Sequence, residues 1–189
     1  MKKLIILASG SGSNAENIIT YFNSGNLAKV SLVLTNKSDA KVLQRCERLN
    51  IPAFYFNKAA FQYGTLLSLL RHENPDLILL AGFLWKIPSS FVEAFPNKII
   101  NIHPALLPKY GGKGMYGNRV HEAVRANSEK ETGITIHYVN EHYDEGAIIH
   151  QEKVALNSED SIESIAKKVH ELEYEHYPKV IEKLLLGDG

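Results

Sequence analysis

The amino-acid sequence predicts an α/β fold with a doubly wound, mostly parallel sheet, an antiparallel C-terminal hairpin and a long final helix. Three observations support this prediction. Short apolar runs alternate with longer helix-like segments, the runs are apolar on consecutive residues, and a glycine-rich turn follows the first run at Gly10–Gly12. Consecutive apolar residues are typical of strands covered on both faces of a parallel sheet. The length of 189 residues predicts a single domain, residues 1–189.

The first half of the chain has the pattern of successive βαβ units. The runs that predict strands are Leu4–Ala8, Val30–Thr35, Leu77–Ala81 and Ile99–Ile102, with a weaker strand at Ala53–Phe56. The segments that predict crossover helices are Asn14–Asn23, Asp39–Leu49 and Phe61–His72, and Ser89–Phe95 predicts a short helix. Strands that alternate with crossover helices form a parallel sheet.

The pattern changes after Asn101. Residues 103–117 include two prolines and four glycines, so we expect a long functional loop there. Beyond it, the sequence predicts a helix at Arg119–Asn127 and two antiparallel strands at Gly133–Val139 and Ala147–Leu156.

The last segment predicts a long helix that starts near Asp160. Asp160 and Glu163 have the spacing of a capping box, and Ile165 and Val169 follow on one face. Pro178 is expected to kink or interrupt this helix.

Composition narrows the possible partners. Twenty-one basic residues balance twenty-one acidic residues, so the chain has no general attraction to nucleic acid or to an anionic membrane. No apolar stretch is long enough to span a bilayer, and the first one, Leu4–Ala8, is too short for a secretion signal. The single cysteine, Cys46, cannot form an internal disulfide. We therefore expect a cytoplasmic protein.

The segment Gly10–Ala15 follows the first predicted strand and opens the first helix. Glycines allow close approach of the backbone to an oxyanion, and free N–H groups at a helix start favour it, so this loop predicts a phosphate site. A dinucleotide site is less favoured, because the second strand ends at Thr35-Asn36-Lys37 without the acid that would bind a ribose. A tight strand-to-helix turn without a ligand is the third possibility.

Asn101 and His103 lie at the end of a predicted strand. Residues two apart on a strand point to the same side, so an amide and an imidazole are expected to face one point. Ligands bind at this edge of an open α/β sheet. Taken alone, each residue also has a structural explanation: a histidine before a proline is often a hydrogen-bonding group of the fold.

Asp144 lies in a turn that is rich in titratable groups. Turn chemistry alone would explain an aspartate before Glu145-Gly146. The neighbouring His137, Glu141 and His142 match no compact zinc pattern, so no metal site is expected. Ser11 and Ser13 do not lie in a nucleophile elbow, which disfavours a serine hydrolase.

Together these motifs identify a resemblance to the folate-dependent phosphoribosylglycinamide formyltransferases, over essentially the whole chain. The segments that carry it are Gly10–Asn14, Leu80–Phe83, Asn101–Tyr110 and Tyr143–Gly146. The resemblance implies a Rossmann-like formyltransferase fold and transfer of the formyl group of 10-formyltetrahydrofolate to the primary amine of phosphoribosylglycinamide, in purine biosynthesis. No metal and no covalent enzyme intermediate are implied, and the partners are small molecules, with a monomer or weak homodimer expected.

The resemblance also implies residue roles. Asn101 and His103 would stabilise the formyl oxygen, and Asp144 would keep His103 protonated by raising its pKa above the usual value of roughly 6.5. The residues that bind the ribonucleotide phosphate would be Gly12, Ser13 and Asn14, and Glu173 would accept a hydrogen bond from its ribose. The residues that contact the folate pterin would be Leu84, Trp85, Ile87, Asn140, Glu141 and Asp144.

Two departures from the family pattern concern the loops. Asn57–Thr65 offers Lys58 where relatives carry an arginine for the folate tail, and Gly111–Gly117 is richer in glycine than its usual counterpart.

Methionyl-tRNA formyltransferase and formyltetrahydrofolate hydrolase are rival members that need further domains. A non-catalytic nucleotide-binding module would leave the later motifs unexplained.

Overall fold

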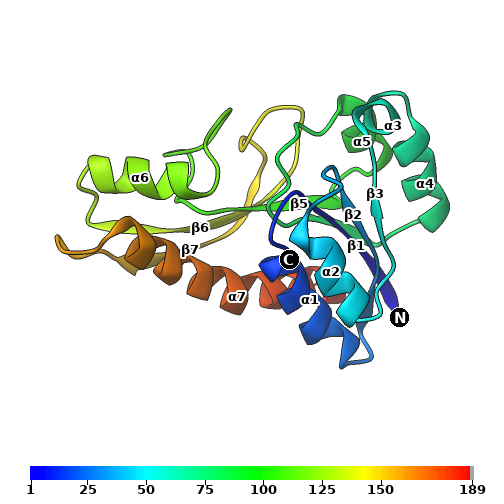
Figure 1. Cartoon of the computed structure of the whole chain (residues 1–189), viewed down its shortest axis with the longest axis horizontal. Helices are drawn as coiled ribbons and strands as arrows, with labels where there is room; N and C mark the ends of the chain where they lie inside the picture. Colours follow the sequence, from blue (N-terminus) through cyan, green and yellow to red (C-terminus); the bar gives the residue numbers. More distant parts are fainter. Residues whose placement is uncertain (188–189) are drawn as a thin grey trace. The chain divides into compact units, whose positions relative to one another are not determined.

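The computed structural model describes residues 1–187, and the chain divides into two compact units, Met1–Ile100 and a second that begins at Asn101. Figure 1 traces both units along the sequence. Among the described residues, no helix has the length and apolar character that crossing a membrane requires.

The first unit is built on four parallel strands. They are β1 (Lys2–Ala8), β2 (Ala28–Thr35), β3 (Ala53–Tyr55) and β4 (Leu77–Leu80), hydrogen-bonded in the order β3-β2-β1-β4. Central strand β1 is fully apolar over Leu4–Ala8, and these residues are buried. The sequence order of the strands reverses at β1, as in a doubly wound sheet. All four strands lie where the apolar runs predict them.

Five helices belong to this unit among its described residues. They are α1 (Ser13–Asn23), α2 (Lys41–Arg48), α3 (Lys58–Gln62), α4 (Thr65–Glu73) and α5 (Ser89–Ala94). Figure 1 shows α1 beside α2, and α3, α4 and α5 together in a second group. The single helix predicted at Phe61–His72 is wrong: Gly64 has a φ of 91° and separates α3 from α4. Glycine adopts this left-handed conformation at little cost.

The second unit carries the antiparallel hairpin and the long helix. Its elements after β5 (Ile99–His103) are α6 (Asn118–Ala126), β6 (Glu131–Tyr138), β7 (Ile148–Ala155) and α7 (Ile162–Leu186). Strands β6 and β7 pair antiparallel, with Thr135 opposite Gln151 and Ile136 opposite His150. Figure 1 shows α7 running along β6 and β7. The predicted hairpin is confirmed.

Two details of α7 differ from the sequence prediction. The N-cap is Ser161, whose side chain accepts a hydrogen bond from the Ser164 backbone N–H, and Asp160 is not the cap. The Asp160 carboxylate instead accepts hydrogen bonds from Ser164 Oγ at 2.6 Å and Lys168 Nζ at 2.5 Å. Pro178 does not interrupt the helix, which continues to Leu186.

Candidate active site

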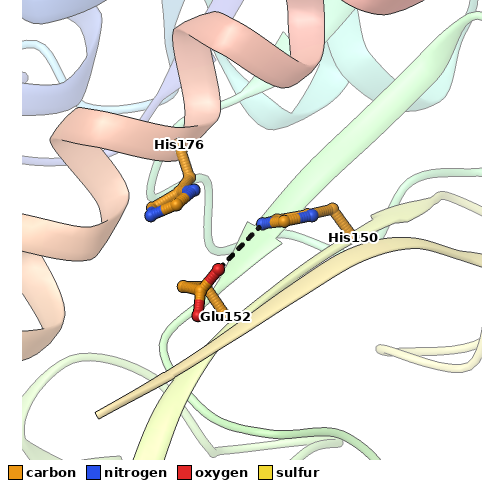
Figure 2. A group of neighbouring side chains, drawn as sticks. All are labelled: His150, Glu152 and His176. Carbon is orange, nitrogen blue, oxygen red and sulfur yellow. Dashed lines mark ion pairs between the residues drawn. The ribbon is translucent and has the colours of Figure 1, made fainter.

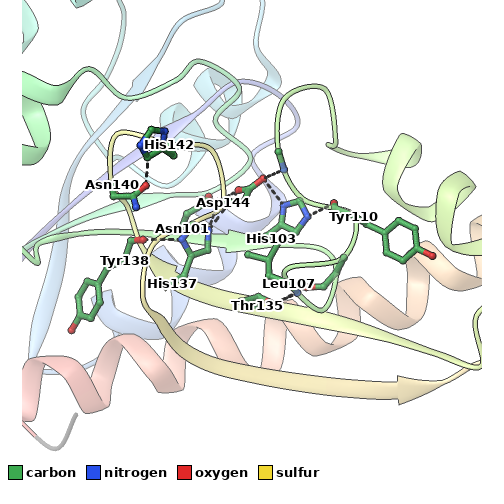
Figure 3. Close-up of polar contacts among 12 residues, drawn as sticks. Asn101, His103, Leu107, Tyr110, Thr135, His137, Tyr138, Asn140, His142 and Asp144 are labelled. Carbon is green, nitrogen blue, oxygen red and sulfur yellow. Dashed lines mark hydrogen bonds and ion pairs between the residues drawn. The ribbon is translucent and has the colours of Figure 1, made fainter.

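Three polar side chains of the second unit converge at the end of β5. Asn101 and His103 lie two residues apart on this strand, and Asp144 lies in the turn between β6 and β7 (Figure 3). Asn101 Nδ2 donates to Asp144 Oδ1 at 3.4 Å, and His103 Nδ1 lies 3.5 Å from Asp144 Oδ2. The strand pleat explains why the first two residues face the same side. The turn brings the third to them.

Asp144 is held in place by the glycine-rich loop as well as by these side chains. The Gly112 backbone N–H donates to Asp144 Oδ2 at 2.9 Å, and the Asp144 backbone is left-handed, with a φ of 56°. A methyl group on Gly111 would lie 3.3 Å from Asp144 Cβ and 2.5 Å from Leu107 Cδ2. The loop therefore needs glycine at position 111 to approach this closely.

The Asp144 carboxyl group is ionised across the neutral range. Burial raises its pKa, but hydrogen bonding from His137, the charge of His103 and the Gly112 N–H outweigh burial, and the net pKa lies below its usual value. Its side chain is only 12% exposed. The site therefore contains a largely buried negative charge that accepts from Asn101 Nδ2 and the Gly112 N–H and faces the His103 ring.

His103 is buried and fixed through both ring nitrogens. Nε2 lies 2.7 Å from the carbonyl oxygen of Tyr110. A carbonyl only accepts, so Nε2 carries the proton and Nδ1, on the Asp144 side, is the nitrogen that gains or loses one. Tyr110 itself is tethered, since its hydroxyl donates to Glu129 Oε1 at 2.8 Å.

The expectation that His103 has a raised pKa is wrong for this structure. Burial lowers the pKa of His103; the Asp144 carboxylate and the Tyr110 carbonyl raise it, and His137 lowers it further. The net pKa lies below the usual value because desolvation disfavours the charged ring more than Asp144 stabilises it. His103 is therefore neutral near pH 7 until another anion joins the site.

His137 belongs to the site, although the sequence did not assign it a role there. Its Nδ1 donates to the Tyr138 carbonyl at 2.8 Å, and Nε2 lies 3.2 Å from Asn101 Nδ2. The same Nε2 lies 3.6 Å from Asp144 Oδ1. His137 is buried on β6 among apolar residues. The sequence signal that could have indicated this role is a histidine at a buried position of a predicted strand. Its partners Asn101 and Asp144 come from other segments, so spacing alone does not identify them.

Thr135 anchors the segment that follows His103. Its hydroxyl donates to the Ala105 carbonyl at 2.7 Å and accepts from the Leu107 N–H at 3.0 Å and from Gln151 Nε2 at 2.9 Å. Gln151 also donates to the Leu107 carbonyl at 3.0 Å. Residues 104–117 form the loop predicted at 103–117, since His103 still belongs to β5, and hydrogen bonds from Thr135 and Gln151 hold the first part of this loop on the hairpin.

The glycine-rich loop of the first unit has the conformation of a tight strand-to-helix turn. Gly12 has a φ of 75°, and a methyl group there would lie 2.5 Å from Val42 Cβ. Gly12 is therefore required for packing against α2. Ser13 opens α1, and Asn14 follows it, so both residues lie in the first turn of that helix.

Helix α2 also fixes the carbonyl groups of this loop. The Val42 N–H donates to the Gly10 carbonyl at 3.2 Å, and Arg45 Nε donates to the Ser11 carbonyl at 2.8 Å. Arg45 additionally pairs with Glu16 on α1. These contacts hold the loop in shape at a helix N-terminus, where anions are favoured.

The residues of the first unit that are expected to bind folate lie after β4. The Leu84 N–H donates to Ser9 Oγ at 2.9 Å, and Ser9 Oγ donates to Asn36 Oδ1 at 2.7 Å. Trp85 packs at 5.4 Å, centroid to centroid, against Phe61 in an aromatic cluster, and Ile87 is buried. Trp85 and Ile87 therefore contribute to the apolar packing of this unit.

The remaining predicted residues are in the second unit. Asn140 Oδ1 accepts from the His142 N–H at 2.9 Å, which shapes the turn before Asp144, and Glu141 is exposed. Glu173 is buried on α7, with Oε2 3.8 Å from His170 Nε2. Asn140, Glu141 and Asp144 thus share one turn, whereas Glu173 comes from a different element.

Comparisons with known proteins show the family to which the chain is similar. The family described as formyl transferase matches residues 2–181. A phosphoribosylglycinamide formyltransferase of Bacillus subtilis (strain 168) is 42% identical, with 98% of this chain and 95% of that protein covered. One from Haemophilus influenzae is 40% identical, with 96% and 86% covered.

Solved structures extend the similarity to the fold. The phosphoribosylglycinamide formyltransferase of Bacillus halodurans has a TM-score of 0.88 at 35% identity, with 97% of this chain and 95% of that chain covered. The glycinamide ribonucleotide transformylase 1 of Symbiobacterium toebii has a TM-score of 0.90 at 30% identity, with 99% and 89% covered. The predicted fold class and the predicted resemblance are both confirmed.

Proposed function

The chain belongs to the formyl transferase family, and we propose that it transfers the formyl group of 10-formyltetrahydrofolate to the amine of phosphoribosylglycinamide, in purine biosynthesis. One observation carries the proposal. Asn101 Nδ2 lies 3.4 Å from Asp144 Oδ1, and His103 Nδ1 lies 3.5 Å from Asp144 Oδ2. The chain that holds them together is 42% identical to an enzyme named for this reaction. Hydrogen-bond donors held around a buried carboxylate suit acyl transfer, in which an oxygen becomes negative and a proton must move.

The reaction forms one C–N bond and breaks another. The neutral amine attacks the formyl carbon, whose oxygen becomes negative in a tetrahedral intermediate. Collapse of this intermediate breaks the bond to N10 of the folate, and the amine proton ends on N10. The products are the N-formyl ribonucleotide and tetrahydrofolate. The protein must hold two substrates together and stabilise the transient oxyanion.

Asn101 and His103 are the proposed oxyanion donors. Asn101 Nδ2 already donates to an anionic oxygen, Oδ1 of Asp144, and the His103 ring presents Nδ1 to the other carboxylate oxygen. His103 Nδ1 is without a proton in the neutral ring, because Nε2 carries it. The developing oxyanion adds a second negative charge beside the ring, which favours its protonation at Nδ1.

Asp144 is the proposed acceptor for the proton that leaves the attacking nitrogen. An ionised carboxylate can orient a water molecule between this nitrogen and folate N10. His137 and the Gly112 N–H position the carboxylate for this role. Since these contacts keep its pKa low, Asp144 passes the proton on through the water and does not retain it.

Substrate binding follows from the remaining motifs. We propose that Gly12, Ser13 and Asn14 bind the ribonucleotide phosphate and that Glu173 accepts from its ribose. The proposed residues for the folate are Leu84, Trp85, Ile87, Asn140, Glu141 and Asp144. Support comes from the helix start at Ser13 and from the apolar residues after β4.

The setting of the activity is also a proposal. The match over residues 2–181 supports one formyltransferase domain that comprises both units. The buried free thiol of Cys46, whose pKa burial raises to about 11, suits the reducing cytoplasm. We further propose small-molecule substrates, no nucleic-acid partner and a monomer or weak homodimer.

Release of tetrahydrofolate tests the proposed function. The purified chain is incubated with 10-formyltetrahydrofolate, with and without phosphoribosylglycinamide. Release that requires the ribonucleotide supports the transferase. Release at the same rate with water alone would instead identify a formyltetrahydrofolate hydrolase, and absence of release under both conditions would contradict an enzyme of this class.

Calorimetry tests the proposed phosphate site. Gly12 variants are unsuitable, because a methyl group at Gly12 would collide with Val42. Ser13→Ala and Asn14→Ala are expected to weaken phosphoribosylglycinamide binding at least about tenfold each, since a lost hydrogen bond to a charged group costs about 1.5–3 kcal/mol. Ser24→Ala, at the other end of α1, is the matched control. Equal affinity in all three variants and the parent chain would refute the assignment.

A further inference from the structure

A second group of potential ligands lies apart from the residues assigned to formyl transfer. His150 and Glu152 lie on β7, and His176 lies on α7. Each offers a nitrogen or oxygen, and these atoms all lie within 4.8 Å of one another. Figure 2 shows the two side chains of the strand turned toward the helix that carries His176.

The strand pleat places this group on the opposite face of the hairpin from the catalytic side chains. His150 and Glu152 are two apart on β7 and pair with Ile136 and Ile134. Thr135, which contacts Gln151, lies between these two on β6 and therefore faces the other way. Helix α7 covers the His150 face. The group therefore constitutes a site separate from Asp144.

The present contacts leave one nitrogen of the His150 imidazole unsatisfied among the described residues. His150 Nε2 is buried, and among the described residues it has no hydrogen-bond partner. It lies 3.8 Å from Glu152 Oε2, beyond hydrogen-bonding distance. The ring of His150 stacks on that of His176, with centroids 5.3 Å apart and planes at 20°. Two histidine rings in contact beside one carboxylate thus bring three potential metal ligands together.

We propose that His150, Glu152 and His176 bind a divalent transition-metal ion of the zinc, cobalt or nickel class. Imidazole nitrogens suit these metals, and two histidines with one glutamate are a recurring zinc donor set. Zn–N and Zn–O bonds of about 2.0–2.2 Å require the donor atoms to approach one another, which rotation of the partly exposed side chains permits. The exposed fractions of the His150 and His176 side chains are 32% and 20%.

The surrounding charges allow this assignment. Burial lowers the pKa of His150, as do His176 and Lys183, while Glu152 raises it; the net pKa lies below its usual value. Lys183 opposes a bound cation, whereas Glu175, whose Oε2 lies 3.9 Å from His176 Nε2, favours one.

A bound ion would join β7 to α7. His176 lies three residues after Glu173 on the same helix, so the ion would fix the helical turn that carries this buried carboxylate. A ligand that binds only the folded state raises the melting temperature. At a concentration about one hundred times its dissociation constant, Zn²⁺ is expected to raise Tm by about 5 to 10 °C for a chain of this size.

The test uses the full chain without a polyhistidine tag and without substrates. Zn²⁺ titration by calorimetry is expected to give one site per chain, and Co²⁺ is expected to give visible absorption bands of a low-symmetry site. His176→Gln and His150→Gln should each weaken Zn²⁺ binding roughly tenfold or more and reduce the Tm increase by about half or more at the same Zn²⁺ concentration. Circular dichroism verifies that each variant is folded.

His72→Gln is the control, because His72 is an exposed histidine on α4 outside the group. This variant should bind Zn²⁺ as the parent chain does. The proposal is overturned if the parent chain binds no Zn²⁺ at micromolar concentrations, or if folded His150→Gln and His176→Gln bind as tightly as the parent. Weakening in the His72→Gln variant alone would likewise overturn it.

Discussion

Asn101 donates a hydrogen bond from Nδ2 to Oδ1 of Asp144, 43 residues later in the chain, at 3.4 Å. The other carboxylate oxygen, Oδ2, lies 3.5 Å from His103 Nδ1. A single, largely buried carboxylate thus contacts the side chains of two residues that lie two positions apart on one strand. Each part of this arrangement can be tested by a substitution with a specific consequence.

Removal of the His103 ring should slow the chemical step. We expect His103→Ala to lower kcat on the order of a hundredfold or more, with the KM for the ribonucleotide changed less than about threefold, because the ring acts on an oxygen that becomes negative only in the transition state. Steady-state kinetics with both substrates measure this. His72→Ala, at an exposed histidine, should retain parental kcat, and an equal kcat in folded His103→Ala would remove His103 from the mechanism.

Asp144 should raise the His103 pKa relative to a neutral side chain at the same position. Burial lowers this pKa and the Asp144 charge opposes the effect, so Asp144→Asn should lower the pKa further. NMR titration of the His103 ring in the parent chain and in the variant measures the difference. Identical values in the two proteins would show that Asp144 acts on the water or the folate and not on His103.

Gly111 is expected to be essential for the position of Asp144. A methyl group there would lie 2.5 Å from Leu107 Cδ2 and 3.3 Å from Asp144 Cβ, so Gly111→Ala should lower kcat about tenfold by displacing the carboxylate. The double variant Gly111→Ala/Leu107→Val should recover part of this loss, since valine has no δ carbon. Gly25→Ala, where the nearest atom is 3.7 Å away, should have parental activity.

If the double variant recovered nothing while remaining folded, contact with Leu107 would not be the cause of the loss. The Asp144 contact at 3.3 Å would then be the remaining explanation.

His121 should make the protein sensitive to acid. Burial lowers its pKa to about 4, and His170 and His103 add to the effect. In the unfolded chain His121 has a pKa of roughly 6.5, so below this pH it is protonated there while it stays neutral in the folded chain. The free energy of unfolding therefore falls as the pH falls from 6.5 toward 4. The loss from this residue should reach about 2 kcal/mol at pH 5.

Urea unfolding at pH 7 and pH 5 measures this effect. In His121→Leu the difference in unfolding free energy between the two pH values should be smaller than in the parent chain by that amount. His72→Leu should show the parental difference. An unchanged difference in His121→Leu would mean that another group causes the acid sensitivity.

The sequence was sufficient to predict the strands because burial on both faces leaves a strong local signal. Leu4–Ala8 and Leu77–Leu80 are apolar throughout and buried. The ends differ slightly from the predicted ones, since β1 begins at Lys2 and β4 ends at Leu80. The break between α3 and α4 was missed, because a single glycine, Gly64, inside a helical pattern is also tolerated in a continuous helix. The cap of α7 was assigned one residue too early, since Asp160 and Ser161 are both suitable caps.

The site could be predicted in part, where its geometry depends on residues that are close in the sequence. The two-residue spacing of Asn101 and His103 on a strand is a local property, so their common direction follows from the sequence. The role of His137 and the loss of charge on His103 depend on burial and on partners from other elements. The group His150, Glu152 and His176 likewise requires a helix and a strand to be brought together, which spacing alone does not show.

Transfer of an isotopic label tests the central claim most directly. With 10-formyltetrahydrofolate that carries ¹³C in the formyl group, the account predicts a ¹³C-formyl amide on phosphoribosylglycinamide, detected by NMR and mass spectrometry. The parent chain should form this product, and folded Asp144→Asn and His103→Ala should form it at least about a hundredfold more slowly. Appearance of the label only as formate, or parental rates of product formation in both variants, would contradict the account.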